Sequence, residues 1–150
     1  MKRLPYVLLP LGVLALGVLS GSFTDSRDWY ATLEKPFFTP PSWAFGPVWT
    51  VLYLLIGWAG ARKLELGGAR SLWALQMVLN LTWTPVFFGL RAPVPALGII
   101  AAMLITIVAF IVREWRTDRT SALLFVPYAA WVSVATALNL AIVVLNRPGA

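Results

Sequence analysis

The sequence contains no cysteine and no histidine, and these two absences remove several classes of site. Without cysteine there are no disulfides, no thiolate metal ligands and no thiol nucleophile. Without histidine there is no imidazole metal ligand, no histidine-based catalytic triad and no common axial ligand for haem. We therefore expect neither a metal site nor a resident cofactor.

Charged residues are also scarce. They make up 12% of the 150 residues, whereas apolar residues make up 59%. A soluble domain carries about 25% charged residues, so this chain has too few to cover a water-soluble globule, and its apolar content excludes disorder. The length favours a single domain, residues 1–150.

The few charges divide the chain into five apolar runs without a charged residue. Each run is as long as the roughly 20 residues that cross a bilayer as a helix, and backbone groups in lipid must be paired within their own segment. The pattern predicts an all-α integral membrane protein, a bundle of five transmembrane helices. We expect these helices at residues 5–21, 43–65, 71–90, 93–115 and 121–146. A cleaved signal peptide is the alternative for the first run, because Lys2 and Arg3 precede it.

The first connector, residues 23–45, differs from the short and mostly basic linkers elsewhere. Asp25 and Asp28 have the spacing of a helix N-cap and its partner, which predicts a short helix at residues 26–33. Long ordered loops in compact proteins are usually functional. We therefore interpret this connector as a lid over one mouth of the bundle.

The distribution of basic residues predicts the orientation in the membrane. Eight of the 12 Lys and Arg residues fall on the side that holds the N-terminus, so we expect the N-terminus in the cytoplasm and the long connector outside. The basic linkers, Arg62 and Lys63 among them, would face anionic lipid headgroups. The net charge of +6 therefore indicates a lipid bilayer and not a nucleic acid as partner.

Aromatic and amide side chains recur at helical spacing and form stripes in three of the runs. Two structural roles would account for these stripes without a ligand: an interfacial aromatic belt, and hydrogen bonding between helices. Apolar walls with a few polar groups are also typical of a small-molecule site, so these stripes predict an enclosure for a flat apolar ligand. The stripes are Phe45, Trp49 and Tyr53; Gln76, Asn80, Trp83 and Phe87; and Tyr128, Trp131, Ala135 and Leu138.

Three segments carry a resemblance to a known family. They are WYATLEKPFFTPP at residues 29–41 followed by VWTVLY at 48–53, LNLTWTPVFFG at 79–89, and VPYAAW at 126–131 followed by ATALN at 135–139. Together they resemble the TspO/MBR family, which includes the translocator protein or peripheral-type benzodiazepine receptor. The likeness covers nearly the whole chain.

The resemblance implies a five-helix bundle, usually a homodimer, that binds tetrapyrroles such as protoporphyrin IX and, in some members, sterols and benzodiazepine-site ligands. Trp49 and Asn80 match residues that contact the carbonyl group of a synthetic ligand. Trp29 and Tyr30 match loop aromatics above it, and four positions match pocket walls: Phe87, Trp131, Ala135 and Leu138. Residues 139–147 lack the tyrosine of the animal cholesterol motif, so the sequence resembles a member from a bacterial cell membrane.

Two hypotheses about function follow, and the sequence leaves the question of enzyme activity open. The first is a tryptophan-rich receptor or sensor that binds protoporphyrin IX, haem or a related apolar molecule, with a role in porphyrin handling or transport. The alternative is light-dependent degradation of protoporphyrin IX, because Trp49 and Trp131 match tryptophans linked to that reaction in bacterial members. Arg27 or Lys35 is a candidate partner for a porphyrin propionate at the mouth, and the alternative for each is a solvated loop charge.

Overall fold

The structure is a computed structural model, and it describes residues 3–22 and 27–147. Within these ranges the chain is helical and forms no strand, as the sequence predicts. In chain order the elements are α1 (Pro5–Ser22), α2 (Arg27–Thr32), α3 (Ser42–Leu66), α4 (Arg70–Thr84), the π-helical turn η1 (Pro85–Gly89), α5 (Pro93–Glu114) and α6 (Arg119–Leu145).

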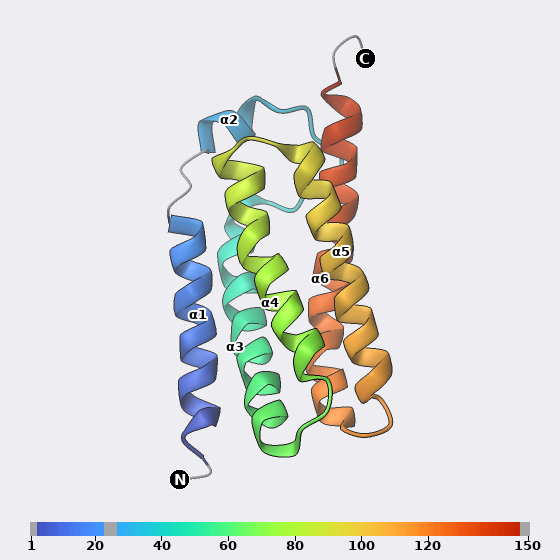
Figure 1. Ribbon diagram of the computed structural model, residues 1–150. Helices are drawn as coiled ribbons and strands as arrows, with labels where there is room; N and C mark the ends of the chain where they lie inside the picture. The colour runs from blue at the N-terminus through green and yellow to red at the C-terminus, as the bar shows by residue number, and fades with distance from the viewer. Residues whose placement is uncertain (1–2, 23–26, 148–150) are drawn as a thin grey trace.

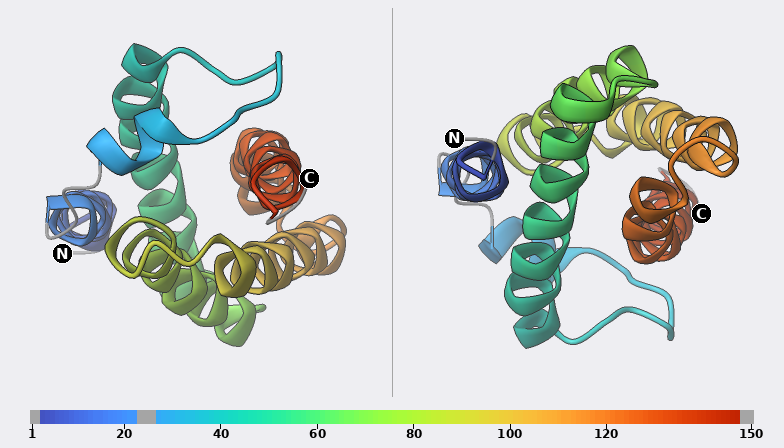
Figure 2. Two further views of the ribbon diagram at one scale, coloured as in Figure 1. Left: turned by 90° about the horizontal axis from the view of Figure 1, so that it is seen from above. Right: turned by 90° about the horizontal axis from the view of Figure 1, so that it is seen from below.

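The long helices run side by side along one axis, and α2 lies across the end of the bundle where α6 ends (Figure 1). Seen along the axis, α1 lies at the edge of the bundle beside α3, while α5 lies between α4 and α6 (Figure 2). The first turn of α1 and the last turn of α6 are at opposite ends (Figure 1).

Within the described ranges, α1, α3, α5 and α6 are long and apolar enough to cross a membrane. The remaining predicted span, residues 71–90, falls on two elements, because α4 ends at Thr84 and the chain continues as η1. Pro85 has no N–H to donate into the helix and disturbs the regular ladder of hydrogen bonds. The Leu90 amide instead donates to the Pro85 carbonyl over 2.9 Å, which is a π-helical bond. The predicted loop helix at residues 26–33 corresponds in place to α2; Asp25 and Ser26 lie outside the described residues.

The bundle is apolar outside as well as inside. Ile56, Ile100 and Phe125 are fully buried, while Leu8, Ile105 and other large apolar side chains on the outer faces are about half exposed or more. The buried polar side chains include Gln76, Asn80 and Asn139. This distribution suits a chain whose solvent is hydrocarbon, because polar groups in lipid point into the bundle.

Glycines bring α1 and α3 into close contact near the middle of α1. A Cβ atom at Gly57 would overlap the backbone of Pro10, and one at Gly17 would overlap the ring of Tyr53. Small residues of this kind allow helix backbones to approach closely in a membrane. The contact fixes α1 against α3 in this part of the bundle.

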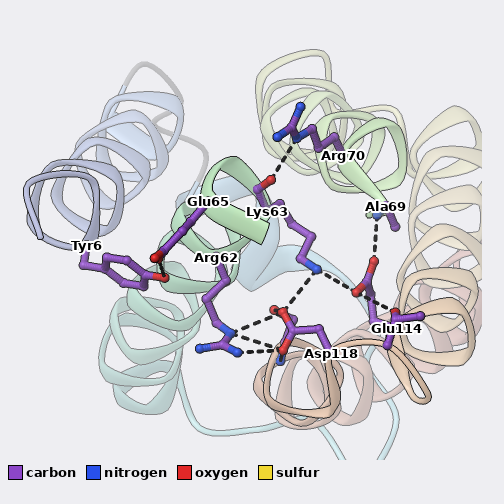
Figure 3. Close-up of polar contacts among 10 residues, drawn as sticks. Tyr6, Arg62, Lys63, Glu65, Ala69, Arg70, Glu114 and Asp118 are labelled. Carbon is purple, nitrogen blue, oxygen red and sulfur yellow. Dashed lines mark hydrogen bonds and ion pairs between the residues drawn. The ribbon is translucent and has the colours of Figure 1, made fainter. Parts of the chain in front are cut away.

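At the opposite end of the bundle from α2, a network of buried ions joins three helices (Figure 3). Lys63 Nζ lies 2.6 Å from Glu114 Oε2 and 3.1 Å from Asp118 Oδ2, and Arg62 Nη2 lies 2.8 Å from Asp118 Oδ1. The backbone N–H of Ala69 donates to the second oxygen of Glu114 over 2.6 Å. The expectation that Lys63 faces lipid headgroups is therefore wrong, because its charge is paired with carboxylates inside the protein. Arg62 is paired with Asp118 as well, but its side chain stays 24% exposed.

Candidate functional site

A cavity of about 370 Å³ lies beneath α2, with walls from α1, α3, α4, η1 and α6. Nine of the residues that the stripes and the family resemblance predict for the site line it: Tyr30, Phe45, Trp49, Tyr53, Trp83, Phe87, Trp131, Ala135 and Leu138. The helical stripes thus meet around one space. Four predicted residues lie outside this lining: Trp29, Gln76, Asn80 and Tyr128.

The walls of the cavity are built from aromatic rings in contact with one another. Trp49 stacks on Tyr53 with ring centroids 5.3 Å apart, and Trp83 stacks on Phe87 at 5.1 Å. Phe45 meets Trp131 edge to face at 5.6 Å. Such contacts hold ring orientations and leave flat apolar faces toward the cavity.

Two polar groups of the lining have no hydrogen-bond partner within the described part of the chain. They are the hydroxyl of Tyr30 and the indole N–H of Trp131, and both atoms are buried. Burial raises the pKa of Tyr30 above its ordinary value, so this hydroxyl stays protonated and is a donor at neutral pH. A buried donor without a partner costs roughly 1–3 kcal/mol. A ligand that brings a hydrogen-bond acceptor to either group removes that cost.

Charge is absent from the cavity lining among the described residues. A cation outside the cavity, Lys35, contacts the lining residue Tyr30: its Nζ lies 4.7 Å from the centre of the Tyr30 ring and donates to the Leu33 carbonyl. The side chain of Arg27 lies outside the described residues. The cavity therefore suits an uncharged, apolar body, with Lys35 beside its Tyr30 wall.

Asn80 lies below the cavity and takes part in a hydrogen-bond network between helices. Its Oδ1 accepts from the Tyr53 hydroxyl at 3.4 Å, and its Nδ2 donates to the Tyr128 hydroxyl at 2.6 Å. The Tyr128 hydroxyl in turn donates to Oε1 of Gln76 at 2.8 Å. Of the two interpretations that the sequence left open for these amides, the structure shows the interhelical one. Trp29 packs against Phe87 in an edge-to-face contact, with ring centroids 5.7 Å apart.

The stripe analysis missed Asn139, the buried amide of the lining. Its Oδ1 accepts from the indole N–H of Trp83 at 3.1 Å, and its Nδ2 donates to the Pro93 carbonyl at 2.9 Å. Asn139 follows Ala135 by one helical turn, and a polar residue in an apolar run was the available signal. The α1 residues of the lining were missed as well, because α1 is apolar on every side: Leu14, Gly17, Val18 and Gly21.

The segment that covers the cavity, residues 27–41, is called the lid segment below. Its Trp29, Tyr30 and Leu33 side chains pack on a buried cluster at the end of the bundle that includes Phe87 and Leu138. The backbone N–H of Glu34 donates to Oδ1 of Asn146 at 3.0 Å, and Nδ2 of Asn146 donates back to the Glu34 carbonyl at 3.0 Å. This reciprocal pair fastens the lid segment to the end of α6.

Comparison with known proteins supports the resemblance. The model of the TspO/MBR family matches residues 7–145. Among similar proteins, the tryptophan-rich protein TspO of Archaeoglobus fulgidus is 40% identical over 159 residues, which cover 97% of this chain and 99% of the relative. The protein of the same name in Chlorobaculum tepidum is 38% identical, with 97% and 98% covered. The translocator protein of Homo sapiens is 36% identical, with 79% of each chain covered.

Proposed function

Because the chain belongs to the TspO/MBR family, we propose that it is a membrane receptor that binds a flat, apolar ligand of the tetrapyrrole class in the cavity beneath α2. The observation that carries the proposal is the combination of an uncharged aromatic lining with two buried donors, Tyr30 and Trp131, that lack partners in the described structure. Pockets of this composition hold apolar ligands, and their few polar groups fix the orientation.

Protoporphyrin IX combines the flat aromatic surface and the hydrogen-bond acceptors that match this cavity. Its macrocycle presents two aromatic faces for the rings of Trp49 and Trp83, and its nitrogen and oxygen atoms can accept from the unpartnered donors. Its propionates are charged and cannot be buried unpaired, so they would point toward Lys35. Without histidine or cysteine in the chain, haem would bind by shape and stacking and not through an axial ligand from these residues.

We propose further that α4 and η1 together form the fifth transmembrane segment. Residues 70–89 are continuous helix, and 20 helical residues extend about 30 Å, the thickness of the hydrocarbon core. The excess of basic residues on the N-terminal side favours a cytoplasmic N-terminus, and the absence of the tyrosine of the animal cholesterol motif from residues 139–147 favours a bacterial cell membrane. Assembly into a homodimer through apolar outer faces is the expectation from the family resemblance.

The first experiment is an equilibrium titration of the purified protein with protoporphyrin IX, followed by quenching of tryptophan fluorescence. The variant Ala135→Phe places a ring inside the cavity and should weaken binding by about tenfold or more, a loss of about 1.4 kcal/mol. The matched control is Ala137→Phe, because Ala137 is exposed on the same helix and lies outside the lining. If folded Ala135→Phe protein binds as tightly as the parent, the cavity is not the porphyrin site.

A second candidate function is light-dependent degradation of the bound porphyrin. The observation that favours it is the stack of Trp49 on Tyr53, whose hydroxyl donates into the network below the cavity. Indole and phenol rings in contact are oxidisable groups next to the ligand site. Trp49→Phe should keep most of the binding and lose a reaction that depends on this stack, because Phe is far harder to oxidise than indole. Trp131→Phe tests in the same way the second tryptophan that the family resemblance links to the reaction. Absorbance and mass analysis of products after incubation in light and in darkness separates this reaction from plain binding.

A further inference from the structure

The residues that line the cavity are unevenly exposed. Of the described lining residues, Val18 and Gly21 on α1 and Gly46 and Thr50 on α3 are exposed, while the remainder are buried or partly buried. These four residues come from the last turns of α1 and the first turns of α3. The cavity therefore opens sideways between two helices.

The packing of α1 against α3 explains why the opening lies at this height. Farther from the lid segment, the contacts of Gly57 with Pro10 and of Gly17 with Tyr53 close the seam between the helices. Nearer the lid segment, a Cβ atom at Gly46 would meet nothing within 4 Å. The seam is thus tight over the middle of α1 and open over its last turns, and we call this opening the α1–α3 window.

The end of the cavity that faces the lid segment is closed by contrast. Tyr30 of α2 lines this end; its ring centroid lies 5.5 Å from that of Phe88, and Lys35 Nζ lies 4.7 Å from the centre of the Tyr30 ring. The two hydrogen bonds between Glu34 and Asn146 hold this cover to α6. A ligand that came from the aqueous side would have to break these contacts, whereas the α1–α3 window needs no such rearrangement.

The rim of the window is chemically apolar. The hydroxyl of Thr50 donates to the Gly46 carbonyl at 2.8 Å, so this polar group is already satisfied within α3. Trp43, in the first turn of α3, is 78% exposed, as befits a tryptophan at the headgroup level of a bilayer. Gly46 and Thr50 lie about 5 to 11 Å farther along the helix at 1.5 Å per residue, which places the window at the level of the lipid chains.

We infer that the α1–α3 window is a lateral entrance through which an apolar ligand dissolved in the bilayer passes into the cavity without displacing the lid segment. The inference rests on the proposed function, because it takes the cavity to be the ligand site. Hydrophobic porphyrins partition into hydrocarbon, so the bilayer concentrates the ligand where the window lies. The lid segment then serves to close the site toward water.

The test is a stopped-flow measurement of protoporphyrin IX association and dissociation with the full chain reconstituted in lipid nanodiscs. The variant Gly46→Phe puts a ring into the window. An obstacle at an entrance should slow association and dissociation alike, each by about tenfold, the effect of a barrier raised by about 1.4 kcal/mol. A ring that only crowds the cavity would instead speed dissociation, because it destabilises the bound state. The matched control is Gly98→Phe, because Gly98 is an exposed helical glycine outside the lining whose Cβ would also meet nothing within 4 Å.

Two further variants decide the remaining outcomes. If Gly46→Phe raises Kd, its ring occupies the cavity. Val18→Phe on the opposite rim is then measured, since Val18 is 60% exposed, and it should slow association and dissociation in the same way. Asn146→Ala releases the lid segment and should leave both rates unchanged. The inference is overturned if the window variants exchange ligand at the parental rate, or if Asn146→Ala raises both rates. A parent protein that binds no porphyrin refutes the proposed function and the entrance with it.

Discussion

The buried pair of Lys63 and Glu114 has a measurable effect on stability whose size follows from its surroundings. The two side chains are 3% and 1% exposed and lie 2.6 Å apart. Removal of one partner from a buried ion pair costs about 3–5 kcal/mol, because the other charge stays buried without compensation. The two single substitutions are not equivalent here, since Lys63 has Asp118 at 3.1 Å as a second partner.

Lys63→Met leaves Glu114 with the Ala69 N–H and the Thr117 hydroxyl as its partners and no cation, so we expect the full cost of about 3–5 kcal/mol. Glu114→Gln keeps an acceptor for the Ala69 N–H and leaves Lys63 paired with Asp118, so its cost should be smaller. In the double variant both charges are gone, and its stability should exceed that of Lys63→Met alone.

Thermal unfolding in detergent, followed by circular dichroism, measures these effects. One kcal/mol shifts Tm by roughly 2–4 °C in a domain of this size, so Lys63→Met should lower Tm by about 10 °C. Arg116→Met is the matched control, because Arg116 is an exposed cation in the turn between α5 and α6. The reasoning is refuted if Lys63→Met unfolds within 2 °C or so of the parent, or if the double variant shows the sum of the single losses.

Three other predictions concern separate parts of the molecule. Burial alone would raise the pKa of Asp118, but its hydrogen bonds to a guanidinium, an ammonium and a serine outweigh this effect and hold the pKa well below the ordinary value. Its contribution to stability should be complete above about pH 4, the unfolded pKa, and be lost as the pH falls toward the folded pKa; Asp118→Asn should flatten this acid limb in a series of Tm measurements. Gly57→Ala should destabilise the protein by about 1–3 kcal/mol in thermal unfolding, because the new methyl group overlaps the backbone of Pro10. Tyr30→Phe removes an unpartnered buried hydroxyl, so the unliganded variant should be at least as stable as the parent, while its porphyrin binding should weaken by about 0.5–1.5 kcal/mol; unchanged binding would show that this hydroxyl does not contact the ligand.

Helical periodicity explains how much of the cavity the sequence predicts. Side chains spaced three or four residues apart share a helix face, and an apolar stripe with aromatic rings must face other helices or a ligand. This argument located the walls formed by Trp49 on α3 and by Trp131 and Ala135 on α6. It gave no direction for α1, whose apolar residues surround the helix evenly, so the contribution of Val18 could not be predicted.

The sequence could not predict side-chain contacts between helices, for a different reason. The stripe that contains Asn80 gives its face, but the partner depends on the height at which the next helix presents a polar group. That group is the Tyr128 hydroxyl, 48 residues away in sequence. Lys63 and Glu114 are likewise 51 residues apart, so a count of basic residues assigned Lys63 to the lipid surface when its partner was inside the protein.

The two ends of the bundle differ in a way that bears on how a ligand site survives in so small a protein. A cavity deprives its lining of packing contacts, and an unpartnered buried donor such as the Trp131 N–H adds to the cost. Stability must then come from elsewhere, and the far end supplies packing through the stacked rings of Phe110 and Phe125, 4.2 Å apart. The close contacts of Gly57 with Pro10 and of Gly17 with Tyr53 hold α1 to α3 over the middle of α1. An entrance between these two helices is therefore expected nearer the lid segment, beyond those contacts, and Gly46 lies at that end.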